Sequence, residues 1–123
     1  MVDWDGIGGF ERYPKLMDGL KDIGDVAYVK FLDEGREVNA DIIQKALKDK
    51  GQKNIKARDS LVFVVLEENE KKELWVSRSS HTNMNELKAI RAKHGNAFKG
   101  ALARIERISK DDMAKQSFKF EAA

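Results

Sequence analysis

Apolar and polar residues alternate along parts of the chain, and this pattern predicts β-strands. In residues 26–32 every second side chain is apolar, and Tyr28 and Lys30 fall on the opposite face. Residues 98–108 alternate in the same way. Residues 60–67 are apolar at nearly every position, which is typical of a strand covered on both faces. The pattern predicts five strands, at residues 26–32, 60–67, 73–79, 98–108 and 117–121.

Apolar residues recur every three or four positions in two other segments, which predicts amphipathic helices at residues 39–51 and 83–94. Asn39 is the expected N-cap of the first helix, and Gly51 follows its last turn. This helix is short and rich in lysine, with a thin apolar stripe. The second helix has three candidate N-caps, Ser80, Thr82 and Asn83.

Residues 1–23 follow neither pattern cleanly. Large apolar side chains recur there at helical spacing, but Pro14 and several glycines interrupt any long helix. We therefore expect an irregular N-terminal extension, with a short helix around residues 14–21, laid across the domain. No internal repeat or linker-like composition divides the chain, so residues 1–123 are expected to form one domain.

The order of elements is strand, helix, strand, strand, helix, strand, strand, and two folds compete for it. The first is mainly β with two helices: a five-stranded OB-type barrel, with one helix inserted after strand 1 and another between strands 3 and 4. The alternative is a ferredoxin-like α+β sandwich, which needs only the first six elements. The barrel is favoured because it accounts for the fifth strand and treats the helix at 39–51 as an excursion.

Composition narrows the classes of protein to consider. The chain has 123 residues, 36% of them charged, and no cysteine, which excludes disulfides, thiolate metal ligands and a cysteine nucleophile. Residues 1–9 lack the basic and apolar regions of a signal peptide, and no apolar run is long enough to span a bilayer. We therefore expect a cytoplasmic protein that makes no membrane contact.

The placement of charge is more informative than the net charge, which is only +2. Residues 45–58 are strongly basic, with Asp49 as their only acid. A local basic surface attracts polyanions even when the whole chain is near neutral, although such a cluster is equally consistent with a solvated face. Its members are Lys45, Lys48, Lys50, Lys53, Lys56 and Arg58.

Three segments carry a resemblance to a known group of proteins: residues 24–32, residues 73–80 and residues 98–107. Their strand ends and turn residues resemble those of small OB-fold single-stranded-DNA-binding proteins of archaea, their viruses and plasmids. The resemblance spans roughly residues 24–122, and the helix at 39–51 and residues 1–23 depart from it. It implies non-catalytic, largely sequence-independent binding of single-stranded DNA.

Proteins bind single strands with aromatic side chains that stack on bases and with basic side chains that contact phosphates. The candidate stacking residues are Trp75, Phe63 and Tyr28. Trp75 shares its strand face with Ser77 and Ser79, which indicates a partly wet surface, whereas packing beneath residues 1–23 is the competing interpretation. Phe63 lies in a strand apolar on both faces and fits the core equally well. The candidate phosphate contacts are Lys30, Arg36, Lys56, Arg58, Arg78, Lys99 and Arg104.

The sequence offers no constellation typical of an enzyme or a metal protein. His81 and His94 are the only histidines, and their spacing does not fit a metal site on a helix. The glycine-rich residues 6–10 lack the lysine of a phosphate-binding loop and follow no strand. We therefore expect no catalytic residue, no metal ligand and no cofactor.

Two other functions stand as competing hypotheses. Trp4, Phe10 and Tyr13 lie within a short stretch that could dock onto a protein partner or form a homodimer. RNA binding is the other, because RNA-binding sheets also stack bases on aromatic side chains. Residues 1–23 could either cover or extend the binding face.

Overall fold

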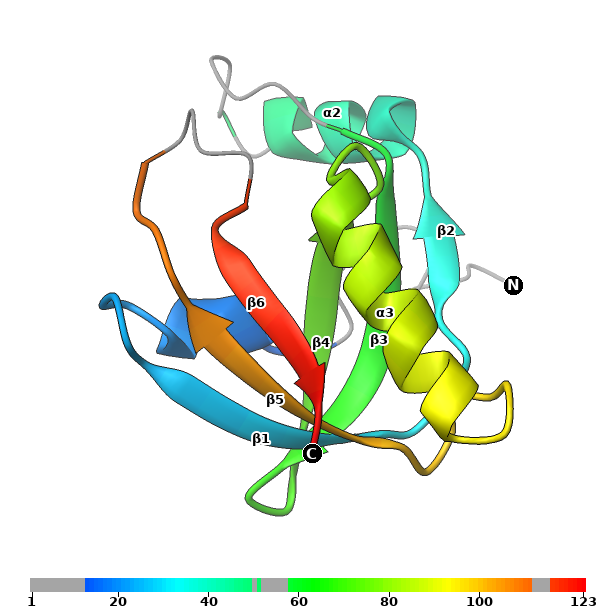
Figure 1. The fold of residues 1–123 in the computed structure, drawn as a ribbon. Coiled ribbons are helices and arrows are strands. Elements are labelled where there is room, and N and C mark those ends of the chain that lie inside the picture. Colours follow the sequence, from blue (N-terminus) through cyan, green and yellow to red (C-terminus); the bar gives the residue numbers. More distant parts are fainter. Residues whose placement is uncertain (1–12, 50, 52–57, 112–115) are drawn as a thin grey trace.

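The computed structural model describes residues 13–49, 51, 58–111 and 116–123, and strands dominate it (Figure 1). The strands are β1 (Val26–Phe31), β2 (Arg36–Val38), β3 (Ser60–Glu67), β4 (Glu70–Ser77), β5 (Leu102–Arg107) and β6 (Phe118–Ala122). The helices are η1, a short 3-10 helix (Leu16–Gly19), α2 (Ala40–Asp49) and α3 (His81–Lys93).

All six strands belong to one sheet, in which each pair of strands is antiparallel. β1 lies between β3 and β5, and β5 pairs in turn with β6. β3 pairs with β4 along one edge, and with both β2 and the end of β1 along the other. The strand order is therefore β4-β3-β1-β5-β6, with β2 beside β1. Among the described residues no strand pairing joins β4 to β6, so the sheet is open between its two end strands.

β1 and β2 are two parts of one segment that bends between them. Leu32 donates its N–H to the carbonyl of Val64 at 2.9 Å. The carboxylate of Asp33 accepts the N–H groups of Gly35 and Val64 at 3.0 and 3.1 Å. Gly35 has a φ of +85°, and a Cβ there would lie 2.6 Å from the ring of Phe63. Both the backbone conformation and the available space therefore require glycine at this bend.

β3 and β4 form the longest strand pair, and a two-residue turn joins them. Glu68 and Asn69 both have a positive φ, of 50° and 66°, as a type I′ hairpin turn requires. The pairing begins with Glu67 opposite Glu70 at the turn. β4 therefore begins at Glu70, three residues before the strand start that the apolar pattern predicts.

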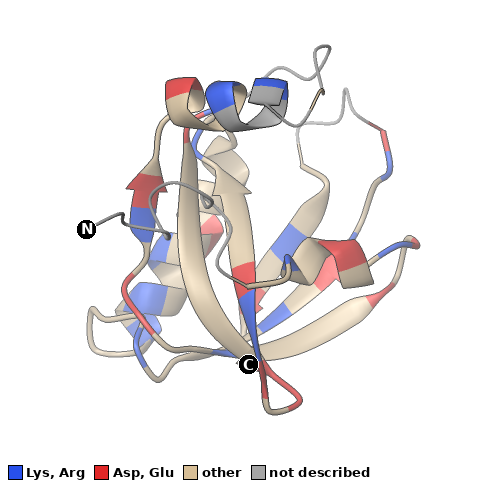
Figure 2. Cartoon of the chain, turned by 180° about the vertical axis from the view of Figure 1, so that it is seen from behind, with Lys and Arg blue, Asp and Glu red and all other residues tan. Residues whose placement is uncertain are grey.

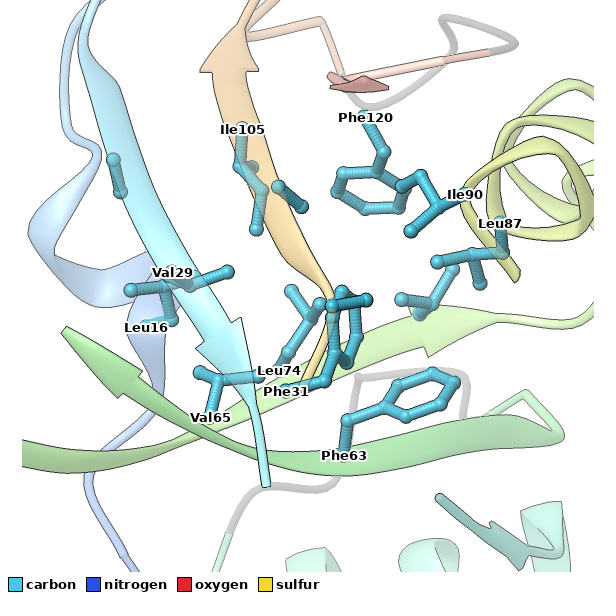
Figure 3. Close-up of a cluster of buried hydrophobic side chains, with 14 of the residues drawn as sticks. Leu16, Val29, Phe31, Phe63, Val65, Leu74, Leu87, Ile90, Ile105 and Phe120 are labelled. Atoms are coloured by element: carbon cyan, nitrogen blue, oxygen red, sulfur yellow. The ribbon is translucent and has the colours of Figure 1, made fainter. Parts of the chain in front are cut away.

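The hydrophobic core lies on one side of the curved sheet, and strands and α3 both contribute to it (Figure 3). Phe31, Phe63 and Phe98 pack against one another with ring centroids 4.8 to 5.2 Å apart. Leu87 and Ile90 of α3 cover the core opposite the strands. In β1 and β5 the buried and exposed residues alternate as their apolar pattern predicts.

The two helices differ in how they are held. Ser80 is the N-cap of α3, since its side chain accepts the N–H of Asn83. α2 lies against the other side of the sheet, where Ile43 packs with Val62 and neighbouring apolar residues. Ile42, the residue before Ile43, is 56% exposed.

The segment formed by residues 14–20 is part of the packed domain. The carbonyl of Pro14 accepts the N–H of Glu73 in β4 at 2.8 Å. Leu16 and Leu20 are buried in the core. η1 lies within the range predicted for a short helix, and residues 1–12 lie outside the described residues. The segment therefore covers part of the free edge of β4.

The mainly β class with two helices is confirmed, and both helices lie close to their predicted ranges. The described part of the chain holds six strands rather than five, because three residues, Arg36–Val38, form a strand too short to show a period in the sequence. The ferredoxin-like alternative does not fit the pairing. A split βαβ unit places another strand between the two that flank its helix, whereas β1 and β3 are direct neighbours.

Candidate nucleic-acid interface

A cleft of about 440 Å³ lies between the end strands β4 and β6. The first turn of α3 and the loop before it contribute one side, and Met17 of η1 also lines it. Its described lining combines the aromatic residues Trp75, Phe118 and Phe120 with hydroxyl and amide side chains from residues 77–83 and 116–117. The lining residues that the structure describes include one arginine, Arg58, one histidine, His81, and no acidic residue.

Trp75 lies on the side of the cleft formed by β4, which we call the β4 wall. Its side chain is half-buried and packs against the cluster of Val62 and Ile43 beneath α2. Its indole N–H donates to a carboxylate oxygen of Glu73 at 3.1 Å. The ammonium of Lys15 lies 5.0 Å from the ring centroid, within the range of a cation–π contact. Trp75 is therefore packed on one part of its surface and lines the cleft with another.

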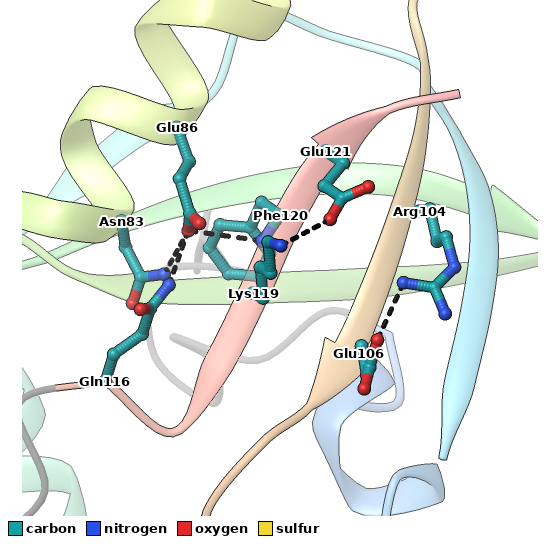
Figure 4. Close-up of polar contacts among 8 residues, drawn as sticks. All are labelled: Asn83, Glu86, Arg104, Glu106, Gln116, Lys119, Phe120 and Glu121. Atoms are coloured by element: carbon teal, nitrogen blue, oxygen red, sulfur yellow. Dashed lines mark hydrogen bonds and ion pairs between the residues drawn. The ribbon is translucent and has the colours of Figure 1, made fainter. Parts of the chain in front are cut away.

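The β6 wall is tied to α3 by a polar network (Figure 4). One oxygen of Glu86 accepts the side-chain N–H groups of Asn83 and Gln116, at 2.8 and 2.7 Å, and the backbone N–H of Phe120 at 3.2 Å. Asn83, which is only 7% exposed, also donates to the carbonyl of Phe118 at 2.7 Å. These bonds fix the first residues of β6 beside the start of α3.

Two predicted phosphate contacts lie at or near this cleft. Arg58 is exposed and lines it directly. Arg78, which directly follows Ser77 of the β4 wall, is half exposed and forms a 3.6 Å ion pair with Glu37. An exposed pair of this kind contributes little to stability, so Arg78 can exchange Glu37 for another anion.

Arg36 is partly exposed and is bound to the sheet by an ion pair. Its guanidinium donates to Glu73 at 3.0 Å, and the Glu73 side chain is fully buried. This ion pair lies on the outer face of the sheet and joins β2 to β4, so this contact of Arg36 is with the sheet itself.

The other predicted surface residues lie elsewhere on the sheet. Tyr28, Lys30 and Arg104 are on the outer face of β1 and β5, the central part of the strand order, whereas the cleft lies between the end strands. Tyr28 is 63% exposed. The structure therefore divides the predicted binding residues between two regions of the sheet, the cleft between its end strands and the outer surface of its centre.

The face that carries Arg104 is balanced in charge. Arg104 bonds to Glu106 at 2.7 Å, which raises the pKa of the guanidinium, and Lys119 bonds to Glu121 at 2.8 Å (Figure 4). The two pairs alternate across β5 and β6, with Arg104 opposite Glu121. Figure 2 shows acidic and basic residues mixed over the molecule in the same way, with acids at the β3–β4 turn. Such a face offers a polyanion little net attraction.

The prediction that Phe63 stacks on a base is wrong. Phe63 is only 1% exposed and packs between Phe31 and Phe98, because it points to the core side of a strand that is covered on both faces. Lys56 lies outside the described residues, as do Lys50 and Lys53 of the basic cluster.

Lys99 is exposed in the loop between α3 and β5. The carboxylate of Glu34 accepts the N–H of Phe98 at 2.9 Å and that of Lys99 at 2.7 Å. These bonds, that from Phe98 first, hold the pKa of Glu34 below its ordinary value. The loop is therefore anchored to the bend after β1, away from the cleft between β4 and β6.

The sequence pattern did not single out Phe118, Gln116 or Asn83 as part of a site. Ser80 and Thr82, two of the candidate N-caps of the second helix, also line the cleft. The cleft brings together segments some forty residues apart, and no local spacing encodes that proximity.

Comparison with known proteins finds no matching family model, no matching curated protein and no matching solved structure. Among the described residues no helix has the length and apolar character needed to cross a bilayer. In the same part of the chain, no group of three or more histidine, aspartate and glutamate side chains is arranged to hold a metal ion.

Proposed function

We propose that the protein binds single-stranded DNA, without catalysis, through the cleft between β4 and β6. We propose also that the sheet is an OB-type barrel that is open between its end strands, β4 and β6. The strand order supports the barrel. With β1 and β2 counted as one bent strand, the described residues form five strands with a helix between the third and fourth, as in OB folds.

The composition of the cleft is the observation that carries the proposal. Trp75 and Phe118 offer aromatic surface to a base, and the hydroxyl and amide groups around them offer hydrogen bonds. Arg58 supplies a cation, and no acidic side chain among the described lining residues opposes a phosphate. Aromatic surface combined with cations is how single strands are bound without strong sequence preference.

The size of the cleft favours a single strand over a duplex. At about 440 Å³ it lies in the range of pockets that hold one small ligand, so it can take one base with its sugar. A base inside a duplex is stacked and paired, and taking it out costs a few kcal/mol. A single strand presents its bases without most of this cost.

Fluorescence anisotropy with a labelled oligo-dT of about 12 nucleotides tests the proposal, since one OB fold covers about 4 to 16 nucleotides. Trp75→Ala should weaken binding by about 5- to 150-fold, because a stacked base contributes roughly 1 to 3 kcal/mol. Tyr28→Ala is the matched control: it removes an exposed aromatic side chain from the outer face of β1 and should leave the affinity unchanged.

A second matched pair tests the phosphate contact. Arg58→Ala should weaken binding and reduce the slope of log K against log salt by about 1, whereas Lys30→Ala should do neither. Unlabelled RNA and duplex DNA serve as competitors. If RNA competes as well as DNA, the proposed ligand becomes single-stranded nucleic acid in general. No binding of oligo-dT at low salt, or equal losses from Trp75→Ala and Tyr28→Ala, would refute the proposal.

A further inference from the structure

Glu73 is a buried carboxylate on the outer face of the sheet. Its side chain is fully buried, and it lies opposite Val64 on β3, next to the pair formed by Val62 and Trp75. Both carboxylate oxygens are used. One accepts the guanidinium of Arg36 at 3.0 Å, and the other accepts the indole N–H of Trp75 at 3.1 Å.

Stability alone does not account for a carboxylate at this position. Burying Glu73 removes its charge from water, whereas its partner Arg36 stays 31% exposed. Replacing a buried ion pair by apolar side chains of similar size is often neutral or stabilising. The neighbours Val62 and Val64 are buried apolar residues that would accommodate such a replacement. What an apolar residue cannot supply is an acceptor for the indole N–H.

The bond to Trp75 fixes the direction of its ring. Residues 73 and 75 lie on the same face of β4, so the carboxylate reaches the indole along the strand. The indole has a single N–H donor, and that donor points at Glu73. Arg36 reaches over β3 from β2 and holds the carboxylate from the other side.

We infer that Glu73 is a positioning residue for the cleft: it sets the orientation in which Trp75 meets a base. The inference rests on the proposed function, because it assigns Trp75 the role of contacting the ligand. Arg36, predicted from the sequence as a phosphate contact, then acts through Glu73.

Two double variants separate positioning from a merely structural role. In Arg36→Met/Glu73→Met both charges are replaced by apolar side chains, so the fold is retained but the indole N–H has no acceptor. In Arg36→Met/Glu73→Gln the charges are also removed, but the amide oxygen can accept the indole N–H. Any contact that Arg36 makes elsewhere is lost in both, so the two variants differ only at position 73, where glutamine supplies an acceptor and also an amide NH2 group.

The readouts are the Kd for labelled oligo-dT and hydrogen exchange of the Trp75 indole N–H, followed by NMR and assigned with Trp75→Phe. The Met/Met variant should bind about 2- to 12-fold more weakly than wild type, the loss expected for one net hydrogen bond, and its indole N–H should exchange faster. The Met/Gln variant should recover most of the affinity and of the protection.

A folded Met/Met variant with wild-type affinity and an equally protected indole N–H would overturn the inference. So would a Met/Gln variant that binds no better than Met/Met. If the wild-type protein bound no oligo-dT, the proposed function would fail, whereas the indole exchange rates would still show whether Glu73 orients Trp75.

Discussion

The bend between β1 and β2 gives the sharpest test of the packing. Replacing Gly35 by alanine puts a Cβ 2.6 Å from Cε1 and 2.8 Å from Cδ1 of Phe63, about 1 Å closer than the ordinary carbon–carbon separation of about 3.5 to 4.0 Å. The ring of Phe63 cannot retreat easily, because Phe31 and Phe98 pack against it at 5.1 and 4.8 Å.

Two costs add in this variant. A left-handed backbone costs a non-glycine residue roughly 1 to 2 kcal/mol, and overpacking a core typically costs about 1 to 3 kcal/mol. We therefore expect Gly35→Ala to lower the free energy of unfolding by about 2 to 5 kcal/mol, a large share of the roughly 5 to 15 kcal/mol typical of a domain.

Gly24 supplies the matched control. Its φ is +95°, close to that of Gly35, but nothing lies within 4 Å of where its Cβ would be. Gly24→Ala should therefore show only the backbone cost, about 1 to 2 kcal/mol. Urea unfolding followed by far-ultraviolet circular dichroism measures both variants.

A double-mutant cycle with Phe63→Leu completes the test. Once the ring is gone, Gly35→Ala should cost no more than Gly24→Ala, and the coupling energy should fall in the range of about 0.5 to 3 kcal/mol seen for residues in contact. Equal destabilisation by Gly35→Ala and Gly24→Ala, or no coupling to Phe63, would refute the reasoning.

Three further variants test polar and turn features. Glu34→Gln removes a carboxylate whose pKa is lowered by the N–H groups of Phe98 and Lys99. A lowered pKa stabilises the fold at a pH above the ordinary pKa of the carboxyl group, and this stabilisation is lost as the pH falls through the lowered pKa. The Tm of the variant should therefore fall less than the Tm of the wild type between about pH 6 and pH 3. Asn83→Ala removes the bonds from a buried amide to Glu86 and to the carbonyl of Phe118 and should cost about 1 to 3 kcal/mol in urea unfolding; no loss would contradict the network. Asn69→Gly relieves a positive φ in the hairpin turn and should raise the Tm slightly, whereas a lower Tm would argue against a type I′ turn.

Local patterns predicted the strands and helices because burial follows a fixed period in each. The alternation at Ala27, Val29 and Phe31 is read directly from the sequence, and the buried face in the structure is the same. β2 was missed because three residues show no period. The pairing of Arg36 with Glu73 was missed because it depends on which strands become neighbours.

The candidate site was predicted only in part, for the same reason. Alternation places Trp75 on the face of its strand opposite Leu74 and Val76, as the structure does, but it does not show what packs on that face. Phe63 fits an exposed or a buried position equally well by pattern, and only the assembled sheet distinguishes them. Phe118 enters the cleft because β6 lies at the opposite end of the sheet from β4, which is a property of topology rather than of spacing.

The contact of residues 14–20 with β4 also bears on solubility. A strand edge with free N–H and C=O groups is a template on which another chain can pair. Pro14 and Lys15 occupy this edge at Glu73, and Leu16 anchors them in the core. A chain cleaved after residue 20 would lose both the cover and the anchor, and we expect it to aggregate. Truncations that test docking through the N-terminal aromatic residues should therefore remove no residue beyond position 12.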